Sequence, residues 1–121
     1  MSDREFTFSQ EKRLKTPAEF QAVFKEPIRS KTTCFTVLAV PNSREHARLG
    51  IIVAKRFEKK AVRRNFVRRL IRESFRHNQQ ILTGLDVVVL LRCGTANQKQ
   101  SFFYNCLEKQ WQQLVKQWQK G

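Results

Sequence analysis

Residues 61–77 are the segment that most constrains the fold, because two kinds of side chain recur along it with the period of a helix. The segment contains no Gly or Pro, and strong helix formers dominate it. At about 100° per residue, one arc is apolar: Phe66, Val67, Leu70, Ile71 and Phe75. The opposite arc is basic and polar: Arg64, Asn65, Arg68, Arg69, Arg72 and Arg76. We therefore expect a helix that packs one side on a sheet and turns an arginine stripe outward.

Positive charge is concentrated around this predicted helix. Ten of the 24 Lys and Arg residues lie between Lys55 and Arg76, and the only acidic residues among them are Glu58 and Glu73. Like charges at helical spacing repel one another, and the planar guanidinium group matches a phosphate. The formal net charge of +14 adds a field that attracts polyanions. The segment therefore indicates a nucleic acid as the partner, with a solvated charged face as the alternative.

Length and composition bound the class of protein. A chain of 121 residues, 40% of them hydrophobic, is enough for one core, so we expect a single domain over residues 1–121. Residues 1–13 are polar and charged, and we expect a flexible tail there rather than a signal peptide. The longest apolar runs, 50–54 and 87–91, are too short to cross a bilayer. We expect a cytoplasmic protein with no membrane contact.

The cysteines are Cys34, Cys93 and Cys106, an odd number at wide spacing. The chain has no CxxC pair, and no histidine lies at short ligand spacing from any of them, so neither a zinc site nor a disulfide framework is indicated. We expect buried free thiols in a reducing cytoplasm.

The pattern of elements predicts an α+β fold, in which helices cover a single sheet of about four strands. Thr16 as cap, Pro17 at the first helical position and Glu19 at capping-box spacing mark the first helix. We expect helices over 17–25, 61–77 and 98–119 and strands over 28–31, 32–40, 48–55 and 86–92. Residues 32–55 are expected to be an antiparallel pair, and the β-branched run 86–92 a central buried strand.

The last predicted helix carries a regular apolar stripe. Its members are Phe103, Leu107, Trp111, Leu114 and Trp118, at steps of four, four, three and four. Two readings are open for the tryptophans, stacking on bases or packing in the core, and the regular stripe favours the core.

The residues show no constellation for catalysis by side chains. His46 lies in a polar loop and His77 at the end of the basic helix, and neither has a neighbouring nucleophile in a recognisable setting. The ten acidic residues are scattered, which argues against a two-metal nuclease, and the four glycines form no phosphate-binding loop. We therefore expect no catalytic side chain and no metal ligand in this protein.

The basic segment is the first candidate binding surface. Arg64, Arg68 and Arg72 stand one turn apart, about 5.4 Å per step, which resembles the phosphate spacing of an extended strand. The candidate residues are Lys55, Arg56, Lys59, Lys60, Arg64, Asn65, Arg68, Arg69 and Arg72. The start of the helix adds free N–H groups and its positive end. Asn65 either contacts a sugar or base edge or has no special role.

A groove between the first helix and an exposed sheet face is the second candidate surface. Its residues are Phe20, Phe24, Thr36 and Leu38. Aromatic rings beside a basic stripe suit unpaired nucleotides, because bases stack on rings while phosphates meet cations. The alternative is that the phenylalanines are simply buried, which we expect of at least one of them.

At these residues the chain resembles the protein component of bacterial ribonuclease P. The family has a basic helix of the form K-x-x-x-[KR]-A-V-x-R-N-x-x-[KR]-R-x-x-R-[EQ], and the matching stretch here is RFEKKAVRRNFVRRLIRE, residues 56–73. The flanking segments RLKTPAEFQAVFK, RLGIIVAK and DVVVLLR also resemble the family's first helix and the strands on either side of the basic helix. The similarity extends from about Arg13 to about Lys116.

The resemblance implies a fold and a function. The fold has the order helix–strand–strand–strand–helix–strand–helix, with a left-handed crossover around the basic helix. The function is that of a subunit that joins a catalytic RNA in removing the 5′ leader of precursor tRNA, while the RNA, with Mg²⁺, performs the hydrolysis. It further implies that the basic residues given above face the catalytic RNA and that Phe20, Phe24, Thr36 and Leu38 line a cleft for the leader. No protein partner is required.

One departure from the family pattern matters. The family usually has Arg directly after the Asn of the motif, whereas this chain has Phe66, and it is open whether Arg63 replaces the missing contact. We expect Arg63, at the start of the helix on its apolar side, to reach water. Three other functions remain as alternatives: a general RNA-binding module of ribosomal-protein type, a helix-based DNA binder and a stand-alone nuclease.

Overall fold

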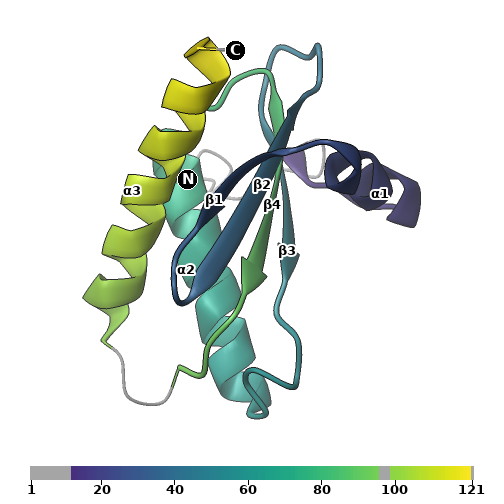
Figure 1. The fold of residues 1–121 in the computed structure, drawn as a ribbon. Coiled ribbons are helices and arrows are strands. Elements are labelled where there is room, and N and C mark those ends of the chain that lie inside the picture. Colours follow the sequence, from purple (N-terminus) through teal and green to yellow (C-terminus); the bar gives the residue numbers. More distant parts are fainter. Residues whose placement is uncertain (1–11, 96–98, 121) are drawn as a thin grey trace, which may run out of the picture.

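The computed structural model describes residues 12–95 and 99–120. Its elements are α1 (Pro17–Lys25), β1 (Ile28–Lys31), β2 (Phe35–Pro41), β3 (Arg48–Ile52), α2 (Ala61–Asn78), β4 (Leu85–Leu91) and α3 (Gln100–Lys120). The predicted α+β class and order of elements are confirmed (Figure 1). Residues 1–11 of the predicted tail lie outside the described residues, whereas Arg13 forms a parallel bridge with Leu49 of β3.

Helix α1 begins at the predicted residue because its cap is complete. The Thr16 hydroxyl accepts a hydrogen bond from the Glu19 N–H at 3.2 Å, and the Glu19 carboxylate accepts one from the Thr16 N–H at 3.0 Å. Pro17 is the first helical residue, a position where no N–H is needed. The helix ends at Lys25, two residues before Pro27, which cannot continue it.

The sheet has the strand order β1-β2-β4-β3, and this order corrects one expectation. Residues 32–55 are not an antiparallel pair, because β4 lies between β2 and β3. β4 pairs antiparallel with β2, Val89 opposite Val37, and parallel with β3, Val88 opposite Gly50. A strand that is apolar on both faces is best buried at the centre. After β3 the chain therefore crosses over through α2, and β4 returns between β2 and β3. This crossover is the connection for which the resemblance implies a left-handed path.

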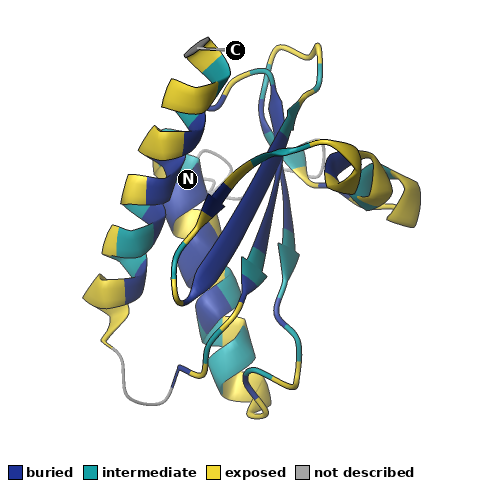
Figure 2. Ribbon diagram, viewed as in Figure 1, coloured by how far each residue is buried: buried dark blue, intermediate teal, exposed yellow. Residues whose placement is uncertain are grey.

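Helices cover both faces of the sheet (Figure 1). On one face α2 and α3 pack against alternate residues of β2 and β4, among them Val37 and Val89. On the other face α1 packs through Val23 against Leu38 and Val88. The buried positions on the strands and on the inner sides of α2 and α3 form the main core (Figure 2).

The predicted stripe of α3 faces this core. Phe103, Leu107, Trp111 and Leu114 are fully buried, and Trp118 is half-buried. Trp111 is thus a core residue, and its Nε1 donates to Ser74 Oγ of α2 at 2.8 Å. The buried amide of Gln110 donates to the carbonyl oxygens of Ser30 and Phe35, at 3.0 and 3.1 Å. Among the helices described, none is long and apolar enough to cross a membrane.

The cysteines correct a second expectation. Cys34 and Cys93 are not free thiols, because the structure joins them in a disulfide, with their Cα atoms 4.7 Å apart. Cys106 of α3 is free and half-buried. The two bonded cysteines are 59 residues apart in sequence, and only the antiparallel pairing of β2 with β4 brings them together.

Candidate nucleic-acid interface

The polar side of α2 faces away from the core, so the arginine stripe lies on the surface. The inner side contributes its buried residues Val67, Leu70, Ile71, Ser74 and Phe75. On the outer side Asn65, Arg69 and Arg72 are exposed, and Arg64 and Arg68 are half-buried. Asn65 Oδ1 accepts a hydrogen bond from Arg68 Nη1 at 3.3 Å, which ties two members of the stripe together. The guanidinium groups are therefore accessible along two turns of the helix.

The start of α2 extends this positive surface. Lys55, Arg56, Lys59 and Lys60 are all exposed in the segment between β3 and the helix. Arg64 Nη1 donates to the carbonyl oxygens of Glu58 and Lys59, at 3.2 and 2.8 Å, so its side chain lies back against that segment. Lys60 is the N-cap and makes no side-chain capping hydrogen bond. This helix end keeps its positive character, which favours an anion.

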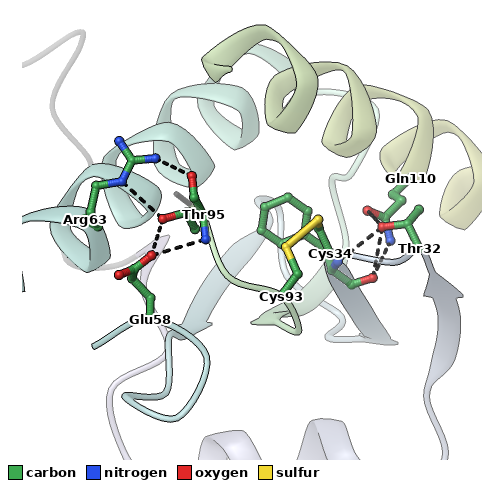
Figure 3. Close-up of a disulfide and its surroundings, with 8 residues drawn as sticks. Thr32, Cys34, Glu58, Arg63, Cys93, Thr95 and Gln110 are labelled. Atoms are coloured by element: carbon green, nitrogen blue, oxygen red, sulfur yellow. Dashed lines mark hydrogen bonds between the residues drawn. A yellow bond between two sulfur atoms is a disulfide. The ribbon is translucent and has the colours of Figure 1, made fainter. Parts of the chain in front are cut away.

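A buried acidic residue, which the sequence analysis did not identify as important, positions this segment. Glu58 is only 8% exposed, and its carboxylate accepts hydrogen bonds from the N–H of Lys60 and of Thr95, each at 3.2 Å. The Thr95 hydroxyl also donates to Glu58 (Figure 3). The bond from that hydroxyl is the main cause that lowers the pKa of Glu58, followed among favourable causes by the backbone bonds. The ionised carboxylate thereby joins the segment before α2 to the residues after β4.

Arg63 belongs to the same network, and the expectation that it reaches water holds only in part, since it is half-buried. Its Nε donates to the Thr95 hydroxyl at 3.1 Å and its Nη2 to the Thr95 carbonyl at 2.6 Å. The Arg63 guanidinium also lies over the ring of Phe66, 4.7 Å from the centroid. Arg63 therefore binds Thr95 within the protein, and its guanidinium stacks on the Phe66 ring. Phe66 itself adds no charge to the basic surface.

The four residues of the second candidate surface do not lie together on an open face. Thr36 and Leu38 are 7% and 5% exposed, because α1 covers this side of the sheet. Phe20 is half-buried and Phe24 is 40% exposed, whereas their neighbour Val23 is fully buried. The expectation of an exposed sheet face is thus wrong. The expectation that at least one phenylalanine is buried holds only in part, since Phe20 packs half-buried against the small core around Val23.

A hollow does lie beside α1, but it is displaced toward β3 and α2. It has a volume of about 160 Å³ and is lined by Arg13, Leu14, Phe20, Leu49, Gly50, Ile51, Arg68 and Arg72. Among the predicted groove residues only Phe20 reaches it, and the two arginines come from the stripe on α2. An aromatic edge and three guanidinium groups therefore meet at one place, which joins the two candidate surfaces.

The electrostatics of this hollow favour an anion. Partial desolvation of the Arg72 guanidinium against the hollow, together with the like charges of Arg13 and Arg68, lowers the pKa of Arg72. Cations that repel one another in this way are stabilised when a phosphate lies between them. Arg13 could not be assigned to the site from the sequence, because only its bridge to Leu49 places it there.

The orientation of α1 depends on an ionic cluster, a second feature that the sequence analysis missed. Arg48 donates to both oxygens of Asp86, through Nε at 2.8 Å and Nη2 at 2.6 Å, and through Nη1 to Glu19 at 2.6 Å. Hydrogen bonds from the N–H groups of Lys15 and Thr16, and then the bond from Arg48, lower the pKa of Glu19 to about 2. One arginine thus ties the start of α1 to β3 and β4.

Carboxylates are not gathered near either surface. Over residues 12–95 and 99–120, no group of three or more His, Cys, Asp and Glu side chains is placed to hold a metal ion. What the arrangement offers chemically is cationic and aromatic: donors for phosphate oxygens and a ring for stacking.

Comparison with known proteins finds relatives over nearly the whole chain. A profile of the Ribonuclease P family matches residues 8–115. The ribonuclease P protein of Staphylococcus aureus is 27% identical and superposes with a TM-score of 0.72, covering 87% of this chain and 93% of that one. The ribonuclease P protein of Thermotoga maritima is 32% identical, with a TM-score of 0.66, covering 87% and 96%. The likeness therefore extends to sequence and fold together.

Proposed function

The chain belongs to the ribonuclease P family, as the protein component of the bacterial type, and from this premise we propose how it takes part in tRNA processing. It binds the catalytic RNA through the stripe on α2 and the basic segment before it. It binds the 5′ leader of precursor tRNA at the hollow beside α1. The RNA carries out the magnesium-dependent cleavage, and the protein contributes no catalytic side chain.

The observation that carries this proposal is the position of Arg68 and Arg72. Both belong to the outer stripe of α2, and both line the hollow that contains Phe20. An RNA strand that follows the stripe can therefore continue into the hollow without leaving positive potential. There a base can stack on the half-buried ring while the flanking phosphates meet guanidinium groups.

The mechanism is electrostatic assistance. Two RNA molecules repel each other, and a protein with a net charge of +14 lowers that repulsion where they meet. Contacts to the leader favour the precursor over the mature product, because the product lacks the leader. The described residues that face the site are cationic, so the Mg²⁺ ions would be held by phosphate groups of the RNA, where they would activate water and stabilise charge. We place this reaction in the cytoplasm and expect it to require no further protein partner.

Cleavage of precursor tRNA by a bacterial ribonuclease P RNA at low magnesium tests the proposal. We expect the RNA alone to be nearly inactive and addition of this protein to restore 5′ processing. A general RNA-binding module of ribosomal-protein type would bind RNA without restoring cleavage, and a stand-alone nuclease would cut without the RNA; either result would overturn the proposal. For variants that remove arginines of the stripe, Arg44→Ala is the control for loss of charge alone, because it removes an exposed charge from the loop between β2 and β3.

A further inference from the structure

The disulfide between Cys34 and Cys93 lies where β2 begins and β4 has just ended. Phe35 of β2 pairs with Leu91 of β4, and the Arg92 N–H continues the ladder by donating to the Cys34 carbonyl at 2.7 Å. The Cα atoms of the two cysteines are consequently 4.7 Å apart, within the range that a disulfide spans without backbone movement. Backbone pairing thus holds the two residues together whether or not the sulfurs are bonded.

The residues after β4 are attached on two sides (Figure 3). On one side the disulfide joins Cys93 to the start of β2. On the other side the fully buried Thr95, two residues further along, binds Glu58 and Arg63 at the beginning of α2. The bridge is therefore two residues away from Thr95, whose hydrogen bonds reach the start of the basic helix.

We propose that Cys34 and Cys93 are a reversible oxidative modification site, whose substrate is a small-molecule disulfide of the glutathione class and whose oxidised state strengthens the RNA interface. Closing the bridge adds a covalent restraint two residues before Thr95, whose hydrogen bonds hold the Glu58 carboxylate and the Arg63 guanidinium at the start of the basic helix. The oxidation of the two cysteines does not depend on the proposed function. The effect of oxidation on RNA binding rests on the proposed function.

The accessibility of the two sulfurs sets the order of the chemistry. Cys93 is half-buried and Cys34 is 3% exposed, so Cys93 meets the oxidant first. Its thiolate attacks one sulfur of the small disulfide and releases one small thiol, which leaves a mixed disulfide on Cys93. The Cys34 thiolate then attacks the Cys93 sulfur and expels the second small thiol. Two protein thiols are oxidised and one small disulfide is reduced to two thiols, and an excess of the small thiol reverses both steps.

The compartment that we propose favours a switch over a permanent bridge. Cytoplasmic thiol buffers keep most cysteines reduced, and cytoplasmic disulfides in mesophiles are usually transient or redox-sensing. The bridge closes a loop of 59 residues in sequence separation, so forming it restricts the unfolded chain considerably. Oxidation is therefore expected to stabilise the fold as well as the interface.

The modification is tested on the full chain with mixtures of reduced and oxidised glutathione, followed by alkylation of free thiols and peptide mass analysis. We expect oxidant to protect Cys34 and Cys93 together and to leave Cys106 alkylated. The melting temperature should rise by about 10 °C on oxidation, an effect absent in Cys93→Ser and retained in Cys106→Ser. Three free thiols at full oxidant, or a bridge that includes Cys106, would overturn the assignment.

The effect on RNA is tested by comparing oxidised and reduced wild-type protein for binding to ribonuclease P RNA, which requires no mutation that could unfold the chain. We expect the reduced form to bind RNA at least about fivefold more weakly than the oxidised form. Cys93→Ser should bind like the reduced wild type under both oxidising and reducing conditions. Equal affinities of the two wild-type forms would refute the coupling. The double variant Arg64→Ala/Arg68→Ala separates the two proposals, because it should lose affinity in both redox states; if it binds like wild type, the proposed function fails while the thiol result stands.

Discussion

Gly50 lies directly beneath the ring of Phe20, at the rim of the hollow beside α1. A Cβ atom at this position would lie 2.5 Å from Cε1 and 2.7 Å from Cζ of that ring, closer than atoms can approach. A glycine inside a strand is often found where another group approaches the backbone closely. The missing side chain therefore lets the aromatic ring rest on β3, next to the arginines of α2.

Replacing Gly50 by Ala should push the Phe20 ring out of the hollow. The ring is half-buried and can turn toward solvent, so we expect the free energy of unfolding to fall by only about 1 kcal/mol, while affinity for a single-stranded leader falls more clearly. Urea denaturation and titration with a short leader oligonucleotide measure the two effects. Gly94→Ala is the matched control, since the nearest atom to its Cβ would be the Phe57 carbonyl oxygen at 3.6 Å. Leader affinity that is unchanged in Gly50→Ala would argue against stacking on Phe20.

Helix α2 acts as a unit, because its buried side fixes where its outer side points. Val67, Ile71 and Phe75 have no exposed surface, so the helix cannot rotate without opening the core. Arg64, Arg68 and Arg72 are thereby presented in one row, although their mutual repulsion disfavours it. We interpret this row as a surface that is completed by the phosphates of a partner.

Replacing Arg68 and Arg72 together by Ala should weaken binding to precursor tRNA in the holoenzyme and flatten its dependence on salt. Each phosphate contact contributes about 0.7 to 0.9 to the slope of log K against log salt, so the loss of two contacts should lower the slope by about 1.4 to 1.8. Filter binding at several salt concentrations measures it. Arg44→Ala removes one charge from an exposed loop and should leave the slope nearly unchanged. An unaltered slope in the double variant would show that the stripe does not contact phosphate.

Helix α1 is held by its acidic cap, and this contact predicts a dependence of stability on pH. The pKa of Glu19 is lowered from 4.5 to about 2 in the folded protein. A lowered pKa means that the contribution is complete above the ordinary value and is lost as pH falls from about 4.5 to 2. Glu19→Gln should therefore lower the free energy of unfolding by about 1 to 2 kcal/mol at neutral pH, a modest loss because the carboxylate is partly exposed. The loss should become progressively smaller at acidic pH.

Thermal melts of wild type and Glu19→Gln between pH 7 and 2 provide the measurement. The two melting temperatures should converge as the pH decreases. Glu45→Gln, at an exposed position in the loop between β2 and β3, serves as control. A difference that stays constant across this range would mean that the ionised Glu19 carboxylate does not hold α1.

At the scale of the whole molecule, the charge of +14 opposes folding. Few ion pairs between Lys or Arg and carboxylates offset it in the part of the chain that the structure describes: Arg48 with Glu19 and Asp86, and Arg76 with Glu73. The basic residues of the stripe and of the segment before it gather on one side of a core that is otherwise well packed. Stability and the proposed binding of RNA therefore depend on the same charges.

Raising sodium chloride from about 0.05 M to 0.5 M should raise the melting temperature of the free protein by a few degrees, because screening weakens the repulsion. Calorimetry or circular dichroism measures this shift. In the complex with RNA the same change should lower the melting temperature, since it weakens phosphate contacts. A free protein destabilised by salt would show that its ion pairs outweigh its net charge.

Local pattern in the sequence determined the elements, the inner and outer sides of the basic helix and, through the motif around Asn65, the family. The capping box of α1, the apolar arc of α2 and the continuous apolar run of β4 each act within a few residues, so periodicity and turn chemistry suffice to predict them.

Only the tertiary structure decided which distant residues meet. The place of β4 between β2 and β3, the pairing of Cys34 with Cys93 and the contact of Glu58 with Thr95 all depend on the path of the chain through α2. Likewise, α1 covers Leu38 of β2, so the predicted groove is closed there and the hollow lies beside Gly50 of β3. Such contacts join residues that are tens of positions apart, and their partners are selected by how whole faces pack, which no local period records.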